Sequence, residues 1–190
     1  MQKIAKVSSI IRAVIAFVFI LHIFTYVGVM FFGDKQGAEN ELAIETQYSN
    51  SLLRVDFDGS WKDMALALEQ EGFDSVAILG SVESIPYLLV YFWLFKLFSY
   101  YRAGNIFTQQ TIRCLKNVGT TLLLWILVSI LYPVVVTLVI RFGGFSETLP
   151  IIINFGSTEL KYLAVGLIVY VIAWVMQEAL SLQSEQELVI

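Results

Sequence analysis

The side chains that could support acid–base, nucleophilic or metal chemistry are few in this sequence and lie far apart. The 190 residues include one histidine, His22, and one cysteine, Cys114. Zinc sites need about three or four protein ligands, so histidine and cysteine alone cannot form one here. A single cysteine also cannot make an internal disulfide. We therefore expect no catalytic residue, no cofactor and no metal ligand in this chain.

The motifs of common enzymes are also missing from the sequence. It has no H-E-x-x-H, no phosphate-binding Walker loop, no Gly-rich dinucleotide turn and no Ser-His-Asp set. An intramembrane protease would need paired acids or a Ser–His pair within its apolar segments, where only His22 is available. A lone histidine more often bonds a hydroxyl or carbonyl inside a helix bundle. The sequence thus predicts a protein that is not an enzyme.

Three further polar or helix-breaking residues interrupt the apolar segments. Lys96 and Glu178 lie near the same end of two segments and form a candidate structural polar pair that would fix helix register. A lysine at this depth could alternatively extend to the lipid headgroups. Pro133 removes a backbone hydrogen bond, so we expect a kink. That kink would either shape packing or act as a hinge.

Four long apolar segments position these residues. Hydrophobic residues make up 57% of the chain and charged residues 15%, against about 45–50% and about 25% in soluble domains. A spanning helix needs about 20 mostly apolar residues, and lipid favours helices because their backbone bonds are satisfied internally. We predict an all-α membrane protein, a four-transmembrane-helix bundle forming one integral membrane domain over residues 1–190. The spans are expected at about 13–32, 85–101, 118–140 and 162–180.

The distribution of basic residues predicts the orientation of these spans. Seven basic residues flank one side of the membrane and five are scattered over the longer loops of the other side, which also carries thirteen of the sixteen acidic residues. The positive-inside rule then places both termini in the cytoplasm. Residues 33–84 and 141–161 become outer loops, 102–117 a cytoplasmic loop and 181–190 a cytoplasmic tail.

The first outer loop is too long for a plain connector. Ser60 followed by Asp63 resembles a capping box, and we predict a short amphipathic helix over Trp61–Gln70. Alternation over Leu52–Phe57 and the apolar run Ile151–Phe155 predict two strands. Together they would form a small mixed helix/strand extracytoplasmic cap. This cap could sense a signal or bind a partner, or it could be a lid that ties the spans together.

The cytoplasmic loop contains a turn followed by a helix start. Gly104 and Asn105 favour the turn, and Thr108 is a good N-cap for a helix starting near Gln109. Arg113 and Lys116 lie three residues apart, on one helix face suited to membrane lipids. The loop is either an ordinary basic flank or a docking site for a cytoplasmic protein.

The tail ends in an apolar run after a polar stretch. Glu187 precedes Leu188, Val189 and Ile190. Such an end either frays or is covered by the loop near Arg102 or by a partner strand. The candidate interface on this side of the membrane therefore comprises Gly104, Ile106, Phe107, Thr108, Arg113, Lys116, Glu187, Leu188 and Ile190.

The loop and the tail resemble domain-of-unknown-function family 2975, an uncharacterised group of small bacterial membrane proteins. The resemblance is carried by Gly104–Thr108, by Leu115 and Gly119, and by the Glu-Leu-x-aliphatic ending at 187–190. The sequence departs from the family at Gln109–Thr111 and at Val189, which weakens any inference about a specific partner. The resemblance implies four spans, a location in the bacterial cytoplasmic (inner) membrane, no established catalytic residue, and a small helix-turn-helix regulator as a cytoplasmic partner.

These features favour a non-enzymatic sensing or regulatory protein that acts with a cytoplasmic partner. The alternative is a small transporter or channel component, for which the third and fourth spans offer few polar residues beyond Thr120, Thr121, Ser129 and Thr137. A homodimer is compatible with the sequence but not indicated by it, because no G-x-x-x-G pair occurs in a span. The net charge of −4 argues against direct nucleic-acid binding.

Overall fold

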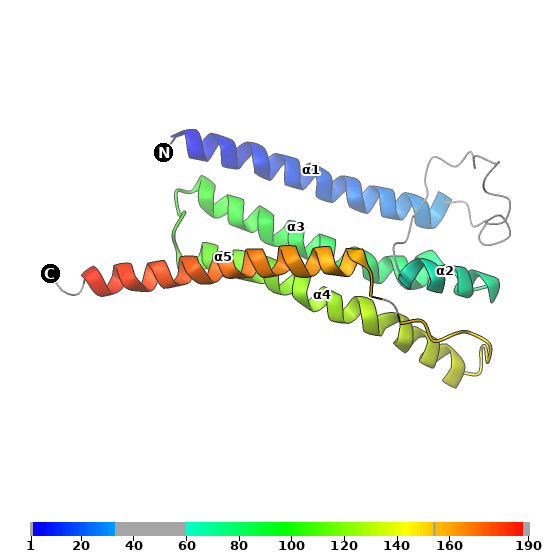
Figure 1. Ribbon diagram of the computed structural model, residues 1–190. Coiled ribbons are helices and arrows are strands. Elements are labelled where there is room, and N and C mark those ends of the chain that lie inside the picture. Colours follow the sequence, from blue (N-terminus) through cyan, green and yellow to red (C-terminus); the bar gives the residue numbers. More distant parts are fainter. Residues whose placement is uncertain (1, 33–59, 154, 188–190) are drawn as a thin grey trace. The chain divides into compact units, whose positions relative to one another are not determined.

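The computed structural model describes residues 2–32, 60–153 and 155–187. In chain order the elements are α1 (Gln2–Phe32), α2 (Ser60–Gln70), the π-helix η2 (Val76–Gly80), α3 (Ser81–Arg102), α4 (Gln109–Phe142) and α5 (Ser157–Glu187) (Figure 1). The described residues contain helices and no strand. The all-α prediction is therefore confirmed for this part of the chain.

Four helices are long and apolar enough to cross a membrane, over Lys3–Phe31, Val76–Arg102, Gln109–Phe142 and Ser157–Glu185. The predicted four spans are confirmed in this sense. At about 1.5 Å per residue, the 34 residues of α4 reach about 50 Å, well beyond a hydrocarbon core of about 30 Å. The helices therefore begin before and continue past the apolar segments. The chain is a multi-pass membrane protein.

The exposed surface of the long helices is rich in apolar side chains. Phe24 of α1 is 75% exposed and Trp174 of α5 is 61% exposed, whereas the hydroxyl residues Ser129 and Thr137 of α4 are buried. In water this distribution would be costly, because large apolar patches drive association. It suits helices whose outer faces contact lipid.

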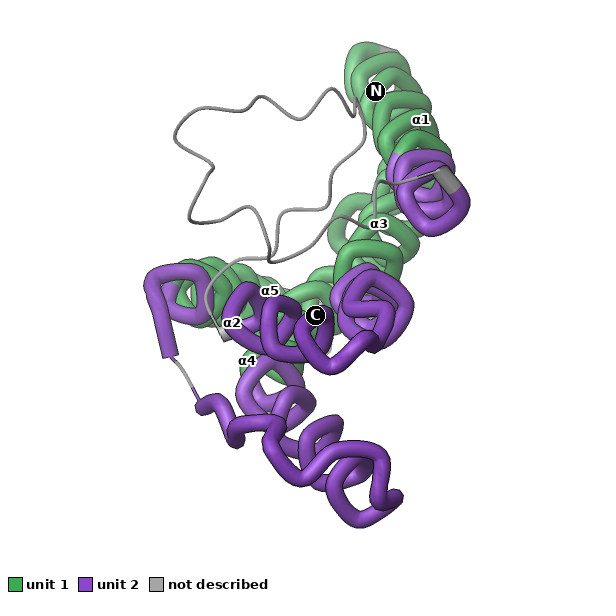
Figure 2. Tube along the Cα trace, turned by 90° about the vertical axis from the view of Figure 1, so that its right-hand side faces the viewer, with its two compact units in different colours: residues 1–21, 86–126, 161–190 green, residues 22–85, 127–160 purple. Residues whose placement is uncertain are grey.

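The chain divides into two compact units, and each long helical segment contributes to both (Figure 2). Unit 1 comprises residues 1–21, 86–126 and 161–190. Unit 2 comprises residues 22–85 and 127–160. Unit 2 therefore contains α2, η2 and the second half of α4, and unit 1 contains the connection between α3 and α4.

Unit 1 is held by close helix contacts and aromatic pairs. A Cβ added to Gly119 of α4 would lie 2.9 Å from the backbone nitrogen of Tyr170 in α5. Gly166 of α5 approaches Leu122 and Leu123 of α4 in the same way. Because small residues let helix backbones approach closely, these glycines set the α4–α5 crossing.

The other helices of unit 1 meet through aromatic rings. Phe19 of α1 meets Tyr91 of α3 edge-to-face, with ring centroids 6.4 Å apart. The hydroxyls of Tyr87 in α3 and Tyr162 in α5 are hydrogen-bonded at 2.5 Å. These contacts link α1 to α3 and α3 to α5, so all four long helices take part in this unit.

Helix α2 fills the core of unit 2. Met64 and Leu68, one turn apart on α2, are fully buried together with Leu79 of η2 and Leu149. Helix α2 begins at Ser60, one residue before the predicted start, and ends at Gln70. Gly72 follows with φ +82° and terminates the helix through bonds from the Gly72 and Phe73 amides to the carbonyls of Glu69 and Leu68.

The prediction of a mixed helix/strand cap is wrong, because the strand expected at Ile151–Phe155 does not form in the described residues. Residues 151–153 and 155 are not in a strand. The Arg141 Nε donates to the Leu149 carbonyl at 2.9 Å, and the Thr137 hydroxyl donates to the Pro150 carbonyl at 3.2 Å. Side chains of α4 thus hold the start of this segment in an irregular course. The other predicted strand, Leu52–Phe57, lies outside the described residues.

Candidate functional site

The amino-terminal end of α2 is fixed to α4 by an aromatic junction within unit 2. The Trp61 ring, 3% exposed, stacks on Tyr132 with centroids 5.4 Å apart and planes at 19°. The Trp61 Nε1–H donates to the Ser129 carbonyl at 3.0 Å. One turn along α2, the Met64 sulfur accepts a contact from the Thr137 hydroxyl at 3.7 Å. We call Trp61, Met64, Ser129, Tyr132 and Thr137 the Trp61 junction.

The Trp61 junction lies where Pro133 interrupts the backbone bonding of α4. A helical residue normally donates its N–H to the carbonyl four positions earlier, and proline has no N–H. The carbonyl that Pro133 cannot bond is that of Ser129, and this is the acceptor of the Trp61 indole. A side chain of α2 therefore supplies a hydrogen bond that the sequence of α4 removes.

Two tyrosines connect the same region to the π-helix η2. The Tyr132 hydroxyl donates to the Ile78 carbonyl at 2.7 Å, and the Tyr26 hydroxyl of α1 donates to the Val76 carbonyl at 3.3 Å. A π-helix has wider turns than an α-helix and occurs often at functional sites. Tyr132 thus contacts Trp61 with its ring and η2 with its hydroxyl.

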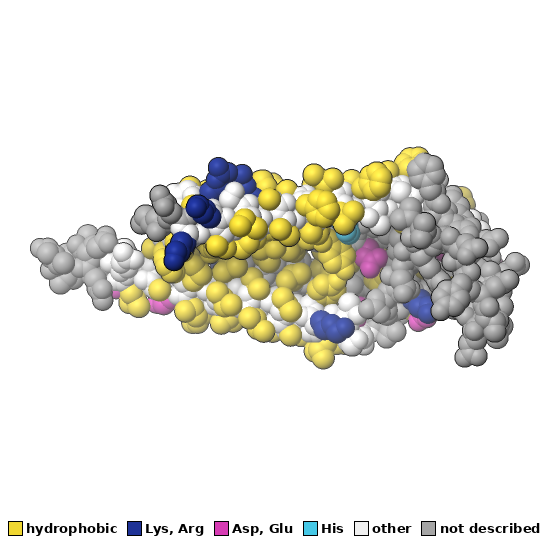
Figure 3. Space-filling model, turned by 90° about the horizontal axis from the view of Figure 1, so that it is seen from above, with side chains coloured by type: hydrophobic (Ala, Val, Ile, Leu, Met, Phe, Trp, Pro, Cys, Tyr) yellow, Lys and Arg dark blue, Asp and Glu magenta, His cyan; other side chains and the backbone are white. Residues whose placement is uncertain are grey.

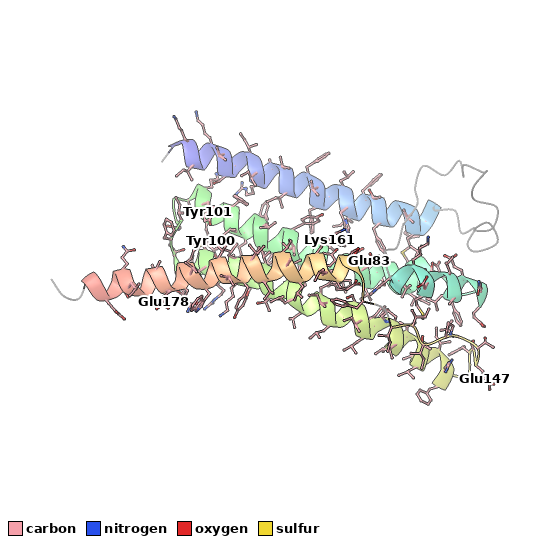
Figure 4. The ribbon with its side chains drawn as sticks, viewed as in Figure 1. Glu83, Tyr100, Tyr101, Glu147, Lys161 and Glu178 are labelled. Carbon is pink, nitrogen blue, oxygen red and sulfur yellow. The ribbon has the colours of Figure 1, made fainter. Side chains whose placement is uncertain are left out.

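At the other end of α4, within unit 1, the α3–α4 loop is held by backbone bonds. The amides of Gly104 and Asn105 donate to the carbonyls of Tyr101 and Tyr100, each at 3.1 Å, and Figure 4 labels these two tyrosines at the end of α3. Gly104 has φ +86°. This pattern is a Schellman termination, for which glycine is favoured. The predicted turn at Gly104 and Asn105 is confirmed.

Two threonines cap the start of α4, which begins at Gln109 as predicted. The Thr108 amide donates to the Thr111 Oγ1 at 3.1 Å, and the Thr111 amide donates to the Thr108 Oγ1 at 3.4 Å. The Thr111 hydroxyl, fully buried, also donates to the Ile106 carbonyl at 2.9 Å. This arrangement resembles a capping box in which threonine replaces the usual Glu or Gln.

The capped loop presents an apolar side chain and positive charges. Phe107 is 66% exposed between the two helices. Arg113 and Lys116 are exposed on the first turns of α4, while Ile112 before them and Cys114 between them are buried. The loop is therefore a pre-organised surface that could bind a protein or a lipid. Among residues 2–32, 60–153 and 155–187, no group of three or more His, Cys, Asp or Glu could hold a metal ion.

A family model described as "Protein of unknown function (DUF2975)" matches residues 9–190. The chain belongs to the DUF2975 family. No curated protein and no solved structure matches it. The match covers most of α1, all of α3, α4 and α5, and the loop between α3 and α4, so the family assignment extends beyond the two motifs that first indicated it.

The DUF2975 loop residues occupy different environments. Gly104 and Thr108 hold the loop conformation, Ile106 provides a carbonyl acceptor for Thr111, and Phe107 is exposed. In the tail, Glu187 is the last residue of α5, whereas Leu188 and Ile190 lie outside the described residues. Within the described part of the candidate interface, Phe107, Arg113 and Lys116 are the side chains available to a partner.

Lys96 and Glu178 have other surroundings in the described part of the chain than the predicted pair. The Lys96 ammonium lies over the Trp93 ring, 5.6 Å from its centroid. Glu178 is exposed on α5 (Figure 4), and the described residues show no ion pair between it and Lys96. Their pairing stays a prediction.

The hydroxyl side chains of the spans bond mainly to the protein backbone. Thr121 donates to the Asn117 carbonyl at 2.8 Å, and Thr137 donates to the Pro133 carbonyl at 3.1 Å. These are bonds to the carbonyl one turn earlier in the same helix, which satisfy the hydroxyls within α4. His22 is half-buried in the part of α1 that belongs to unit 2.

Sequence analysis missed three features of these sites. The sequence predicts Trp61 only as part of an amphipathic helix, and the signal for its contact is Pro133, four residues after Ser129, which leaves the Ser129 carbonyl without a donor. For Thr111 the signal is its spacing of three residues from Thr108, which matches a capping box. Gly119 and Gly166 were each single in their spans, and only the structure places them at one helix crossing.

Proposed function

We propose that this DUF2975 protein is a non-enzymatic sensing or regulatory protein of the bacterial inner membrane, and that it acts on a cytoplasmic partner. The observation that carries the proposal is the continuity of α4. Its outer half is bonded to α2 at the Trp61 junction, and its first turn is capped onto the loop that exposes Phe107. A change at α2 would act on the same helix that presents the loop.

The Trp61 junction provides a physical basis for such signalling. A proline site lacks one bond of the helix ladder and can bend more easily than a regular helix. The Trp61 indole stabilises one geometry of that site by bonding the Ser129 carbonyl. A ligand or partner that moved α2 would remove this bond. The conformational equilibrium of α4 between its geometry with the bond and its geometry without the bond would then shift by the difference in the ligand's affinity for the two.

The partner that fits the proposal is a small cytoplasmic helix-turn-helix regulator, as the family resemblance implies. The protein itself would contribute no nucleic-acid surface, because its net charge is −4. The exposed Phe107 would provide an apolar anchor, and Arg113 and Lys116 would attract an acidic surface. The distribution of basic residues supports a cytoplasmic position for this loop under the positive-inside rule.

Site-specific photo-crosslinking in native membranes tests the partner. A photoreactive phenylalanine analogue at position 107 should cross-link to a soluble protein. The same analogue at Phe142, which is 88% exposed near the other end of α4, provides the matched control and should not give that adduct. Identical adducts at both positions, or lipid adducts alone at 107, would contradict a docking loop.

No observation in the described part of the chain favours the alternative, a small transporter or channel component. The hydroxyls of Thr121 and Thr137 bond to backbone carbonyls of α4. A flux assay in liposomes separates the two functions, and we expect no protein-dependent flux.

A further inference from the structure

The connection between α4 and α5, residues 143–156 of unit 2, exposes large apolar side chains. These side chains are Phe145, Ile151, Ile153 and Phe155. Between Arg141 and Glu159 the only charged residue is Glu147. Exposed apolar side chains gathered in this way mark contact with a membrane or with another protein.

A row of exposed apolar side chains on α4 leads into this connection. Each member has a neighbour in the row three or four residues away, so the row lies on one helix face. Its members are Leu131, Val135, Leu138, Val139 and Phe142. Figure 3 shows that apolar side chains also cover much of the described surface of the long helices. The row therefore suits the lipid-facing side of α4, and it continues to the last residue of the helix.

The connection then runs back along α4 instead of leaving from its end (Figure 1). Gly144, with φ +71°, reverses the chain, and the Phe145 amide donates to the Ile140 carbonyl at 3.1 Å. Farther on, the Pro150 carbonyl accepts a bond from the Thr137 hydroxyl at 3.2 Å. Thr137 lies five residues before the end of α4, about 7.5 Å along the helix axis. Pro150 therefore lies at a level where α4 is still part of an apolar span.

Several backbone groups of the returning chain are paired inside the protein, which contact with lipid requires. The Arg141 Nε donates to the Leu149 carbonyl at 2.9 Å, and the Gly156 amide donates to the Glu159 Oε2 at 2.8 Å. The Pro150 carbonyl has its own donor, and proline has no N–H to satisfy. These pairings reduce the cost of placing an irregular segment against the bilayer.

The polar residues of the connection lie at its turn, before the chain returns along α4. Glu147 and Thr148 are exposed there. The Thr148 hydroxyl donates to the carboxylate of Glu71, which follows α2. The connection is thus divided along its length into a polar turn and an apolar returning stretch. Such a division is expected of a segment that lies at the boundary between water and lipid.

We propose that the returning stretch is an interfacial membrane segment, in which Ile151, Ile153 and Phe155 contact the acyl chains of the lipids. Phe145 would lie at the same interface, closer to water. The bilayer is favoured over a second protein, because these side chains continue the lipid-facing row of α4 and lie beside a level where α4 is still apolar. The proposal needs only that the chain spans a membrane. It does not depend on the sensing role, on a partner or on the side where α4 ends.

Spin-label accessibility in the reconstituted full-length protein tests the proposal. Single labels are attached to Ile153→Cys and Phe145→Cys in a Cys114→Ala background, in liposomes of phosphatidylethanolamine and phosphatidylglycerol. Apolar oxygen concentrates in the bilayer, whereas a charged nickel chelate stays in water. The ratio of oxygen to nickel accessibility should therefore be severalfold higher at position 153 than in the matched control, Glu147→Cys, with position 145 between them. Leu131→Cys provides the lipid reference.

Two outcomes would overturn the proposal. Equal ratios at positions 153 and 147 would show that the returning stretch faces water. Low accessibility to both reagents at position 153 would show that protein covers it, either a partner or a second copy of the chain.

A photoreactive phenylalanine analogue at Phe155 gives a second measurement that keeps Cys114 and does not require a labelled variant to fold. It should yield lipid adducts, and adducts to protein alone would contradict the proposal. The cross-linking at position 107 reports on the cytoplasmic partner, so failure of one proposal is distinguishable from failure of the other.

Discussion

At the scale of single residues, two threonines decide where α4 begins. Thr111 is fully buried, and its hydroxyl bonds both the Thr108 amide and the Ile106 carbonyl. A buried polar group that loses its partner costs about 1–3 kcal/mol. The loop that exposes Phe107 therefore depends on a side chain that no partner would touch.

The Thr111→Val variant tests this dependence. Valine fits the same volume but leaves the Ile106 carbonyl and the Thr108 amide without their hydroxyl partner, so the unfolding free energy in detergent should fall by about 1–2 kcal/mol. Proteolysis in the α3–α4 loop should also accelerate. Gln110→Ala, an exposed neighbour, should change stability by less than about 0.5 kcal/mol. Equal effects of the two variants would show that Thr111 is not the cap.

Trp61 and Pro133 act together through the Ser129 carbonyl, and a double-mutant cycle measures their coupling. Trp61→Phe removes the indole donor, which should cost about 1–2 kcal/mol. In a Pro133→Ala background, the new backbone N–H can bond Ser129 instead. The cost of Trp61→Phe should therefore shrink by about 1 kcal/mol. The changes in unfolding free energy of the two single variants can be summed and compared with the change in the double variant. Agreement within about 0.5 kcal/mol would mean that the two residues do not share this acceptor.

At the scale of elements, glycine determines both helix ends and a helix crossing. Gly72, Gly104 and Gly144 end α2, α3 and α4, each with positive φ. Gly119 instead brings α4 close to α5. The first role depends on backbone conformation and the second on the absence of a side chain.

Substitution at the crossing should separate α4 from α5. In Gly119→Leu the Cβ alone would lie 2.9 Å from the Tyr170 nitrogen and 3.0 Å from the Gly166 carbonyl oxygen. The backbone must move, and overpacking of this kind costs about 1–3 kcal/mol or more. Thermal unfolding in detergent measures the loss. Ala164→Leu, at an exposed position of α5, should be nearly neutral, and a similar loss there would argue against the crossing.

At the scale of the whole molecule, the distribution of basic residues predicts the topology. Both termini are expected in the cytoplasm, because four helices cross the membrane and the basic residues favour that side. A fluorescent reporter that folds only in the cytoplasm, fused to Ile190, should therefore be active. A phosphatase active only outside, at the same position, should be inactive. The opposite pattern would reverse the orientation and place the Phe107 loop outside the cell.

The sequence by itself determined the class of the protein and the local signals along it. Apolar segments of about 20 residues can satisfy their backbone bonds in lipid only as helices, so four spans followed from composition. The helix Trp61–Gln70, the turn at Gly104 and the start of α4 at Gln109 followed from neighbouring residues, because caps and turns are local interactions.

Only the tertiary structure decided which distant residues meet. Trp61 reaches the Ser129 carbonyl across 68 positions, and Gly119 meets the backbone near Tyr170. The strand predicted at Ile151–Phe155 failed for the same reason, because Arg141 and Thr137 bond the carbonyls of Leu149 and Pro150. An apolar run indicates that a segment can be buried. The packing of the helices decides which hydrogen-bond donors reach the backbone of that segment.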